Sequence, residues 1–292
     1  MDGNAQAREL GEELRRARRN SGMTIEEILS VLGWAKVTLL RLEDGRRGKS
    51  AWDIARLLGV LHADTETCER VNRLLRQPVT REFVRSHPRR AHDDLAVLAV
   101  HEQRAATITT YDRTGVPPLL QTEDYARLDL AYTQDVDHAL RIRLDRQKRM
   151  YEDWTPETPA VFYIHESALS TPVPDDDATD VMCNQLLWLA FAGREFHRRV
   201  RLVPAARHGP RHPFTLMTFA RPLRSLAYTG TATATVFTEG HDAVYRPLVA
   251  ELDRIALDPD RTVEELHRRA DALSGTAIHQ AATTSSQGHP AR

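Results

Sequence analysis

The segment GWAKVTLLRLEDGRR, residues 33–47, carries two cationic side chains, Lys36 and Arg41, within a stretch whose pattern predicts a short helix. Lysine and arginine can donate hydrogen bonds to O6 and N7 of guanine, and small apolar side chains can contact the methyl group of thymine. This chemistry requires both kinds of side chain on one helical face. The residues expected on that face are Ala35, Lys36, Val37, Leu40 and Arg41.

Hydroxyl and basic side chains on either side of this face could hold phosphate groups. Basic side chains supply charge, and groups at a helix N-terminus can approach a phosphate oxygen. The alternative is that the basic residues form only a solvated loop and that Leu40 packs against a neighbouring element. The candidates for phosphate contact are Thr24, Thr38, Arg46, Arg47 and Lys49.

Four short helices are expected to position these residues. Leu10, Leu14 and Ala17 have the spacing of one apolar helical stripe, and Thr24 followed by Glu27 has the spacing of a capping box. Glycines then punctuate the pattern, as expected where a helix ends and the chain turns. The expected boundary residues are Gly22, Thr24, Gly33, Gly45 and Ser50.

A helix, a capped helix, a glycine turn and a third helix ending in E-x-G follow the order of a helix-turn-helix module. Residues 8–62 resemble the phage-repressor-like (XRE) helix-turn-helix domain through the phrases LGEELRRARRNSGMT, EEILSVLGW and RLEDGRR. The resemblance implies binding to double-stranded DNA through the third helix. The chain departs from the family at Leu29, where a small residue is usual, at Thr38, where a lysine is usual, and at Leu40, where a small polar residue is usual.

From about residue 105, strand-like alternation and amphipathic helical patterns take turns along the chain. The order of VPPLLQTEDYARL, RLDRQKRMYE, HESAL, NQLLWLA, VRLVP and HPFTLMTF resembles the C-terminal domain of actinobacterial XRE regulators of the antitoxin-like group. That domain has no settled activity. The resemblance implies a module that senses a small molecule or binds a small partner protein. His165 stands where the family usually has an aspartate.

Histidine and acidic residues of the C-terminal part match no catalytic or metal-binding motif. His208 and His212 are four residues apart, but Gly209 and the prolines around it predict a loop and not a zinc-binding helix. A metal site needs three or four ligands, and no third ligand has motif spacing. We therefore expect no metal and no cofactor, and we lean against catalysis without excluding it. The other pairs considered are His165–Glu166, Glu195 with His197, and Glu239 with His241.

A ligand pocket in the C-terminal part remains plausible, although aromatic residues at helix and strand spacing more often belong to a core. His165 and Glu166 on one strand would point to opposite faces and could not both address one atom. The candidate pocket residues are Tyr111, Tyr125, His165 and Glu166.

Composition and charge narrow the class of protein. Residues 1–90 carry a net charge of +5 and the remainder a net charge of −6, so we expect only the N-terminal part to meet a polyanion. No apolar run reaches the length of a membrane span, and the polar N-terminus shows no signal peptide. The two cysteines, Cys68 and Cys183, are far apart and predict a reduced, cytoplasmic setting.

The sequence thus predicts an α+β protein that acts as a homodimeric, DNA-binding transcriptional regulator. The competing hypothesis is a protein that has lost DNA binding and binds or transforms a metabolite through its C-terminal domain. An exposed Leu40 would favour the first hypothesis, and a buried Leu40 the second. The expected parts are a helix-turn-helix domain at 1–62, a helical linker at 63–104, a mixed α/β effector domain at 105–273 and a disordered tail at 274–292.

Overall fold

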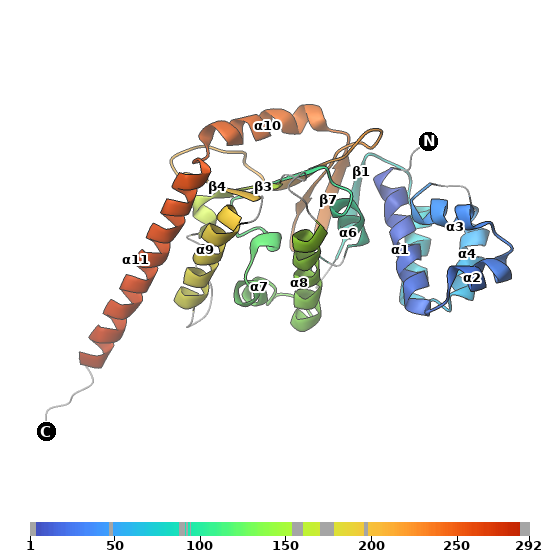
Figure 1. The fold of residues 1–292 in the computed structure, drawn as a ribbon, viewed down its shortest axis with the longest axis horizontal. Coiled ribbons are helices and arrows are strands. Elements are labelled where there is room, and N and C mark those ends of the chain that lie inside the picture. The colour runs from blue at the N-terminus through green and yellow to red at the C-terminus, as the bar shows by residue number, and fades with distance from the viewer. Residues whose placement is uncertain are drawn as a thin grey trace, which may run out of the picture.

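The first five helices of the computed structural model form a bundle at one end of the molecule (Figure 1). The structure describes residues 4–46, 49–87, 91, 93, 95–153, 160–169, 178–195 and 198–286. The predicted capping boxes at Thr24 and Ser50 are both formed. The helices of the bundle are α1 (Ala5–Ser21), α2 (Ile25–Leu32), α3 (Lys36–Glu43), α4 (Ala51–Val60) and α5 (Thr65–Arg76).

The apolar stripe predicted for the first helix lies in the core of this bundle. Leu10, Leu14 and Ala17 of α1 are each at most 6% exposed and share a cluster with Leu39 and Leu42 of α3. Burial of such side chains contributes about 1.5–3 kcal/mol each. Because α3 buries one face in this way, its opposite face is left to the solvent.

The rest of the chain is built on one seven-stranded sheet with the strand order β1-β7-β6-β5-β2-β3-β4. The neighbours β2, β3 and β4 run parallel, and the other pairs run antiparallel. Strands β3 and β4 therefore lie on one side of β2, and β5, β6, β7 and β1 lie on the other side. The strands are β1 (Glu82–Ser86), β2 (Thr107–Asp112), β3 (Ala160–His165), β4 (Arg198–Val203), β5 (Phe214–Thr218), β6 (Leu226–Gly230) and β7 (Ala234–Glu239).

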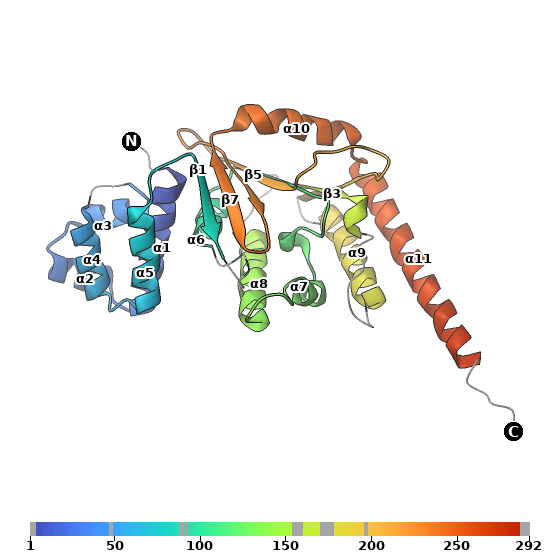
Figure 2. The same ribbon diagram turned by 180° about the vertical axis from the view of Figure 1, so that it is seen from behind.

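Helices cover both faces of the sheet. One face carries α6, α7, α8 and α9, and α10 lies across the other face, with α11 packed along α9 (Figures 1 and 2). The helical elements are α6 (Ala96–Glu102), η2 (Pro118–Leu120), α7 (Glu123–Asp129), α8 (Val136–Asp153), η3 (Glu166–Leu169), α9 (Ala178–Glu195), α10 (Asp242–Ile255) and α11 (Pro259–Ser286). The fold class is α+β, as predicted.

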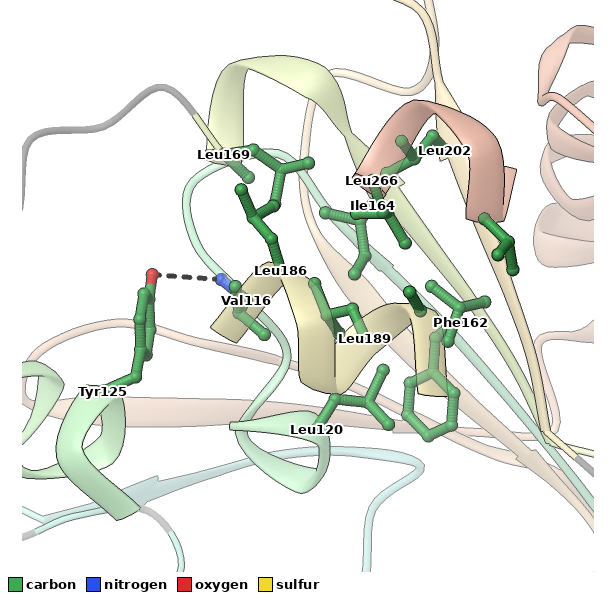
Figure 3. Packing of buried hydrophobic residues seen from close by; sticks show 14 of the residues in the cluster. Val116, Leu120, Tyr125, Phe162, Ile164, Leu169, Leu186, Leu189, Leu202 and Leu266 are labelled. Carbon is green, nitrogen blue, oxygen red and sulfur yellow. Dashed lines mark hydrogen bonds between the residues drawn. The ribbon is translucent and has the colours of Figure 1, made fainter. Parts of the chain in front are cut away.

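The largest core cluster lies between the parallel strands and α9 (Figure 3). Phe162 and Ile164 of β3 meet Leu186 and Leu189 of α9, and Leu266 of α11 closes the cluster. All five side chains are at most 1% exposed. These parallel strands are covered by helices on the side where their apolar residues gather, which accounts for their β-branched and aromatic composition.

The segment SLAYTGTATATVF folds as the hairpin β6–β7, because residues 231–233 form a tight turn closed by the hydrogen bond from Thr231 N–H to Ala234 O. The linker expected from the sequence differs from the structure. Within the expected linker at 63–104, α5 joins the N-terminal bundle and β1 joins the sheet, where Phe83 pairs with Phe237.

The C-terminal stretch also differs from expectation. A disordered tail was expected from residue 274, but α11 continues to Ser286. The segment TAIHQAA within it contains alanine and glutamine, which favour helices, and it continues a helix that has already been nucleated on α9. The low content of large apolar residues hid this extension from the sequence pattern.

Helices α1 and α3 approach closely at Gly11. A Cβ atom at this position would lie 2.4 Å from the carbonyl oxygen of Glu43, at the end of α3. No side chain fits in that space without moving the backbone of one helix. The glycine of the phrase LGEEL therefore sets the distance between α1 and α3.

Replacing Gly11 by alanine is expected to lower the free energy of unfolding by about 1–3 kcal/mol, because overpacking forces the two backbones apart. Gly59→Ala is the matched control, since a Cβ atom there meets nothing within 4 Å. That change lies inside α4 and is expected to stabilise by about 0.5–1 kcal/mol. Thermal unfolding followed by circular dichroism should move in opposite directions for the two variants; equal midpoints would disprove the close-contact argument.

Candidate nucleic-acid interface

Helix α3 presents the predicted face to solvent. Gly33 adopts a left-handed conformation with φ of 67° and turns the chain from α2 into α3. Leu39 and Leu42 point into the bundle, whereas Val37 is 51% and Leu40 is 40% exposed. The solvent-facing residues are Ala35, Lys36, Val37, Leu40 and Arg41.

The exposure of Leu40 favours the first hypothesis, because no other element of the described structure covers this helix surface. Leu29, another of the three departures from the family, is partly buried and packs against the bundle core. The large side chain at position 29 is therefore accommodated without disturbing the helix-turn-helix arrangement.

The cations of this face are available for new contacts. Lys36 Nζ lies 3.4 Å from Glu26 Oε1, and both side chains are exposed, so this pair contributes little to stability. Among the described residues, the guanidinium groups of Arg41 and Arg46 have no hydrogen-bond or ion-pair partner. Lys49 Nζ lies 4.4 Å from the centroid of the Trp34 ring, which holds the ammonium group beside the turn.

The remaining candidates for phosphate contact differ in their surroundings. The Thr24 hydroxyl lies 2.8 Å from the Glu27 carboxylate, to which it donates, and Glu27 N–H donates to Thr24. A phosphate at this helix start would have to displace a carboxylate whose pKa is already lowered by the Thr24 backbone N–H. Thr38 is half-buried. Arg47 lies outside the described residues.

A buried acidic residue holds the back of α3. Glu43 is 2% exposed, and Arg18 of α1 donates to both of its oxygens, at 2.6 and 3.0 Å. Arg15 adds bonds to the Glu43 carbonyl at 3.2 Å and to Asp44 at 3.0 Å. This contact was not predicted from the sequence, although the glutamate of E-x-G and the arginines of LRRARR are the residues that form it. The clamp fixes the orientation of the recognition helix.

Helix α1 also ties the bundle to the rest of the molecule. Arg8 Nε donates to His101 Nε2 of α6 at 2.9 Å, and another Arg8 nitrogen donates to Glu239 of β7 at 3.1 Å. Ala5 N–H also donates to Glu239, at 3.1 Å, and Glu9 forms a buried ion pair with Arg85 of β1. These partners come from distant parts of the sequence, and no local sequence motif predicts the contacts between them.

His101 is neutral in this junction. It is fully buried, and burial, followed by the charge of Arg8, lowers its pKa from 6.5 to about 3. The contact of 2.6 Å between its Nδ1 and the Val97 carbonyl places the proton on Nδ1, and Nε2 then accepts from Arg8.

The four residues of the candidate pocket do not come together. Tyr111 is 1% exposed at the carboxyl end of β2, where a hollow opens. The Tyr125 hydroxyl accepts from Val116 N–H at 3.4 Å, within the largest core cluster. His165 contacts Ser167, and Glu166 pairs with Arg269 of α11 at 3.2 Å. Only Tyr111 of these four lines the hollow.

Two arginines of the phrase RLDRQKRMYE form a buried ion network behind that hollow. Arg143 donates to Asp93 at 2.9 Å and to Asp129 at 2.6 Å, and Arg146 pairs with Asp93 and, at 2.5 Å, with Glu102 of α6. Both arginine side chains are at most 3% exposed. The network connects α8 to α6, the helix that carries His101.

Glutamines of the phrases that carry the C-terminal resemblance hold the loop before α7 in place. Gln147 Nε2 donates to the carbonyls of Pro118 and Gln121, at 2.8 and 3.0 Å, and Gln121 Nε2 donates to Val116 at 2.8 Å. Gln185 of α9 donates to the Leu120 carbonyl and accepts from Thr122 N–H. The residues that carry the C-terminal resemblance thus have structural roles in this loop.

The described residues offer no group of three histidine, cysteine or acidic side chains that could hold a metal ion. His208 and His212 lie in the loop between β4 and β5, as their glycine and proline neighbours predict. His197 and the side chain of Glu195 lie outside the described part. Within the described residues, no helix is long and apolar enough to cross a membrane.

An N-terminal helix-turn-helix with an open recognition face, joined to a sheet domain with helices on both faces, defines the architecture of a DNA-binding regulator. Residues 9–71 match the family described as a helix-turn-helix domain. Residues 95–268, more than half of the chain, match the domain of unknown function DUF5753, and the chain belongs to that family. No curated protein matches the chain. The function of the C-terminal domain is unknown.

Proposed function

We propose that this chain is a sequence-specific transcriptional regulator that reads DNA through α3. The proposal rests on Arg41, which has no partner among the described residues and lies beside Lys36 on a solvent-facing helix. Glu43 and Arg18 hold this helix from behind. Lys36 and Arg41 donate to guanine, and Ala35, Val37 and Leu40 contact thymine methyl groups.

Phosphate contacts supply most of the affinity in this proposal. Arg46, Arg47 and Lys49 follow α3 directly and bind the sugar-phosphate backbone on one side of the groove. Thr24 and Thr38 are secondary candidates. A homodimer places two copies of α3 in successive major grooves of a palindromic site.

The C-terminal domain supplies regulation by binding a small molecule or a small partner protein. The junction of Arg8 with His101 and Glu239 is buried and polar, so a small displacement of α6 or β7 breaks hydrogen bonds to α1. Helix α1 in turn holds α3 through Glu43. A signal at the sheet domain therefore changes the position or rigidity of the recognition helices in the dimer.

Replacing Arg41 by alanine is expected to remove about 1–3 kcal/mol of discrimination between the operator and random DNA. Arg46→Ala is the matched control, because a phosphate contact is sequence-independent: it should weaken binding to all sequences and reduce the salt slope by about 1. The measurement is a gel shift on the upstream region of the protein's own gene, with random DNA as competitor and a salt titration.

Two outcomes would contradict the proposal. Unchanged affinity and unchanged sequence preference of Arg41→Ala would show that α3 does not read bases in this way. Absence of specific binding by the folded wild-type protein would favour the alternative, in which the chain has lost DNA binding and its C-terminal domain binds or transforms a metabolite.

A further inference from the structure

The sheet domain contains a hollow of about 370 Å³ at the carboxyl end of β2. The connections after β2 lead to β3 and β4 on one side, and β5, β6, β7 and β1 lie on the other, so the strand order reverses at β2. In sheets with parallel strands, ligands bind outside the carboxyl ends at such a switch point. The volume falls within the range of small-molecule sites, about 300–1,000 Å³.

The polar wall of this hollow carries more acid than base. Asp112 and Asp129 line it, and among the described lining residues Arg143 is the one cation. Arg143 is 1% exposed and already paired with both Asp93 and Asp129. Its charge is therefore used within the protein, and the Asp112 carboxylate remains without a cationic partner among the described residues.

Asp112 is held in place by its neighbours. Its Oδ1 accepts from the N–H and O–H of Thr114, both at 2.8 Å, and from Gly115 N–H at 3.3 Å. Burial raises its pKa despite these bonds, which is the condition that an incoming positive charge would relieve.

The rim supplies an aromatic surface and hydroxyl groups. Tyr132 is 50% exposed at the edge of the hollow, and a cation can lie over such a ring. The Thr110 and Thr215 hydroxyls lie 3.1 Å apart, and Thr229 and Thr231 also line the hollow. Two carboxylates, an exposed phenol ring and several hydroxyls together suit a small polar cation.

We propose that this hollow binds a small molecule carrying a protonated amine, which pairs with Asp112 and lies against Tyr132. The proposal deepens the sensing role of the C-terminal domain and rests on it, but it concerns binding by the free protein. It therefore succeeds or fails independently of whether α3 reads DNA.

The test is isothermal titration of the full-length protein with putrescine and glucosamine, and with their neutral counterparts butanediol and glucose. At least one amine is expected to bind, and its neutral counterpart is not. Asp112→Asn should weaken amine binding at least about tenfold, and Tyr132→Leu about threefold. Asp145→Asn, an exposed aspartate of α8 outside the hollow, is the matched control and should leave binding unchanged.

Circular dichroism establishes whether each variant is folded. Tyr132→Leu changes a half-exposed side chain and should fold, so it tests the proposal even if Asp112→Asn does not fold. Absence of binding by either amine at millimolar concentration to the folded wild-type protein would overturn the proposal. Equal affinity of the folded Asp112→Asn or Tyr132→Leu variant and the wild type would also overturn it. Specific DNA binding in the gel shift combined with either result would leave the regulator proposal standing.

Discussion

The variant Arg146→Met is expected to lose about 3–5 kcal/mol of stability, because it leaves buried carboxylates without their counter-charge. Arg146 is 3% exposed on its side chain and pairs with Asp93 and Glu102, whose side chains are 0% and 12% exposed. Burial disfavours the charged form, yet the two carboxylates hold the pKa of Arg146 well above its ordinary value. After the substitution, Asp93 keeps its contact with Arg143 but loses the one with Arg146, and Glu102 loses its contact with Arg146.

Arg149→Met makes the same chemical change one turn further along α8, where the side chain is exposed. Its effect should stay within about 0.5 kcal/mol, as for most surface substitutions. The measurement is the thermal midpoint, which moves by about 2–4 °C per kcal/mol in domains of this size. In the Arg146→Met background, Glu102→Gln should recover part of the loss. Equal midpoints for the two single variants would mean that the network contributes no net stability.

The N-terminal bundle could be predicted from sequence because its signals are local. Capping residues such as Thr24 and Ser50, and Gly33 at the turn, act within a few residues of the element that they define. The exposed face of α3 followed from the same periodicity, since burial of Leu39 and Leu42 determines which residues face the solvent. The predicted helix order and the α+β class are confirmed.

Features that depend on distant pairing could not be predicted. Strand β1 lies in a segment of prolines and charges that resembles a linker, and it is a strand only because β7, some 150 residues later, offers a partner. The clamp of Arg18 on Glu43 and the junction of Arg8 with His101 depend on tertiary contacts between residues of unremarkable type. Periodicity contains no information about which charged residues will be buried together.

The C-terminal candidates illustrate the same limit. Tyr111 was a predicted pocket residue and does line the hollow, but the two acids of the hollow, Asp112 at the end of β2 and Asp129 at the end of α7, were not predicted. His165 and Glu166 attracted attention because they are adjacent in sequence. In the structure, His165 contacts Ser167 in the following turn, and Glu166 pairs with Arg269 of α11. Chemistry assembled across elements has to be identified in three dimensions.

Buried polar contacts join several parts of this protein. Arg18 joins α1 to α3, Arg8 joins α1 to α6 and β7, and Arg146 joins α8 to α6. A buried ion pair contributes less net stability than apolar packing, but it tolerates only a narrow range of geometry. In the proposed regulator, such contacts would transmit a change at the sheet domain to α3.

Acid should therefore weaken the junction between α1 and α6. The folded-state pKa of His101 is about 3, against 6.5 for the exposed imidazole, so the unfolded chain binds more protons between these values. The contribution of neutral His101 is present in full above pH 6.5 and is lost as the pH falls towards 3. A shift of this size corresponds to a loss on the order of 5 kcal/mol. Protonation also removes the acceptor for Arg8 Nε.

The comparison that isolates His101 is His101→Gln, because a neutral amide can donate to Val97 and accept from Arg8 without titrating. The other groups at this junction are the same in both proteins, so their contributions cancel in the difference. Urea midpoints measured from pH 7 to pH 4 should fall more steeply for the wild type than for His101→Gln. His138→Gln, at an exposed histidine of α8, should follow the wild type. Parallel curves for wild type and His101→Gln would show that protonation of this histidine does not limit the stability of the junction.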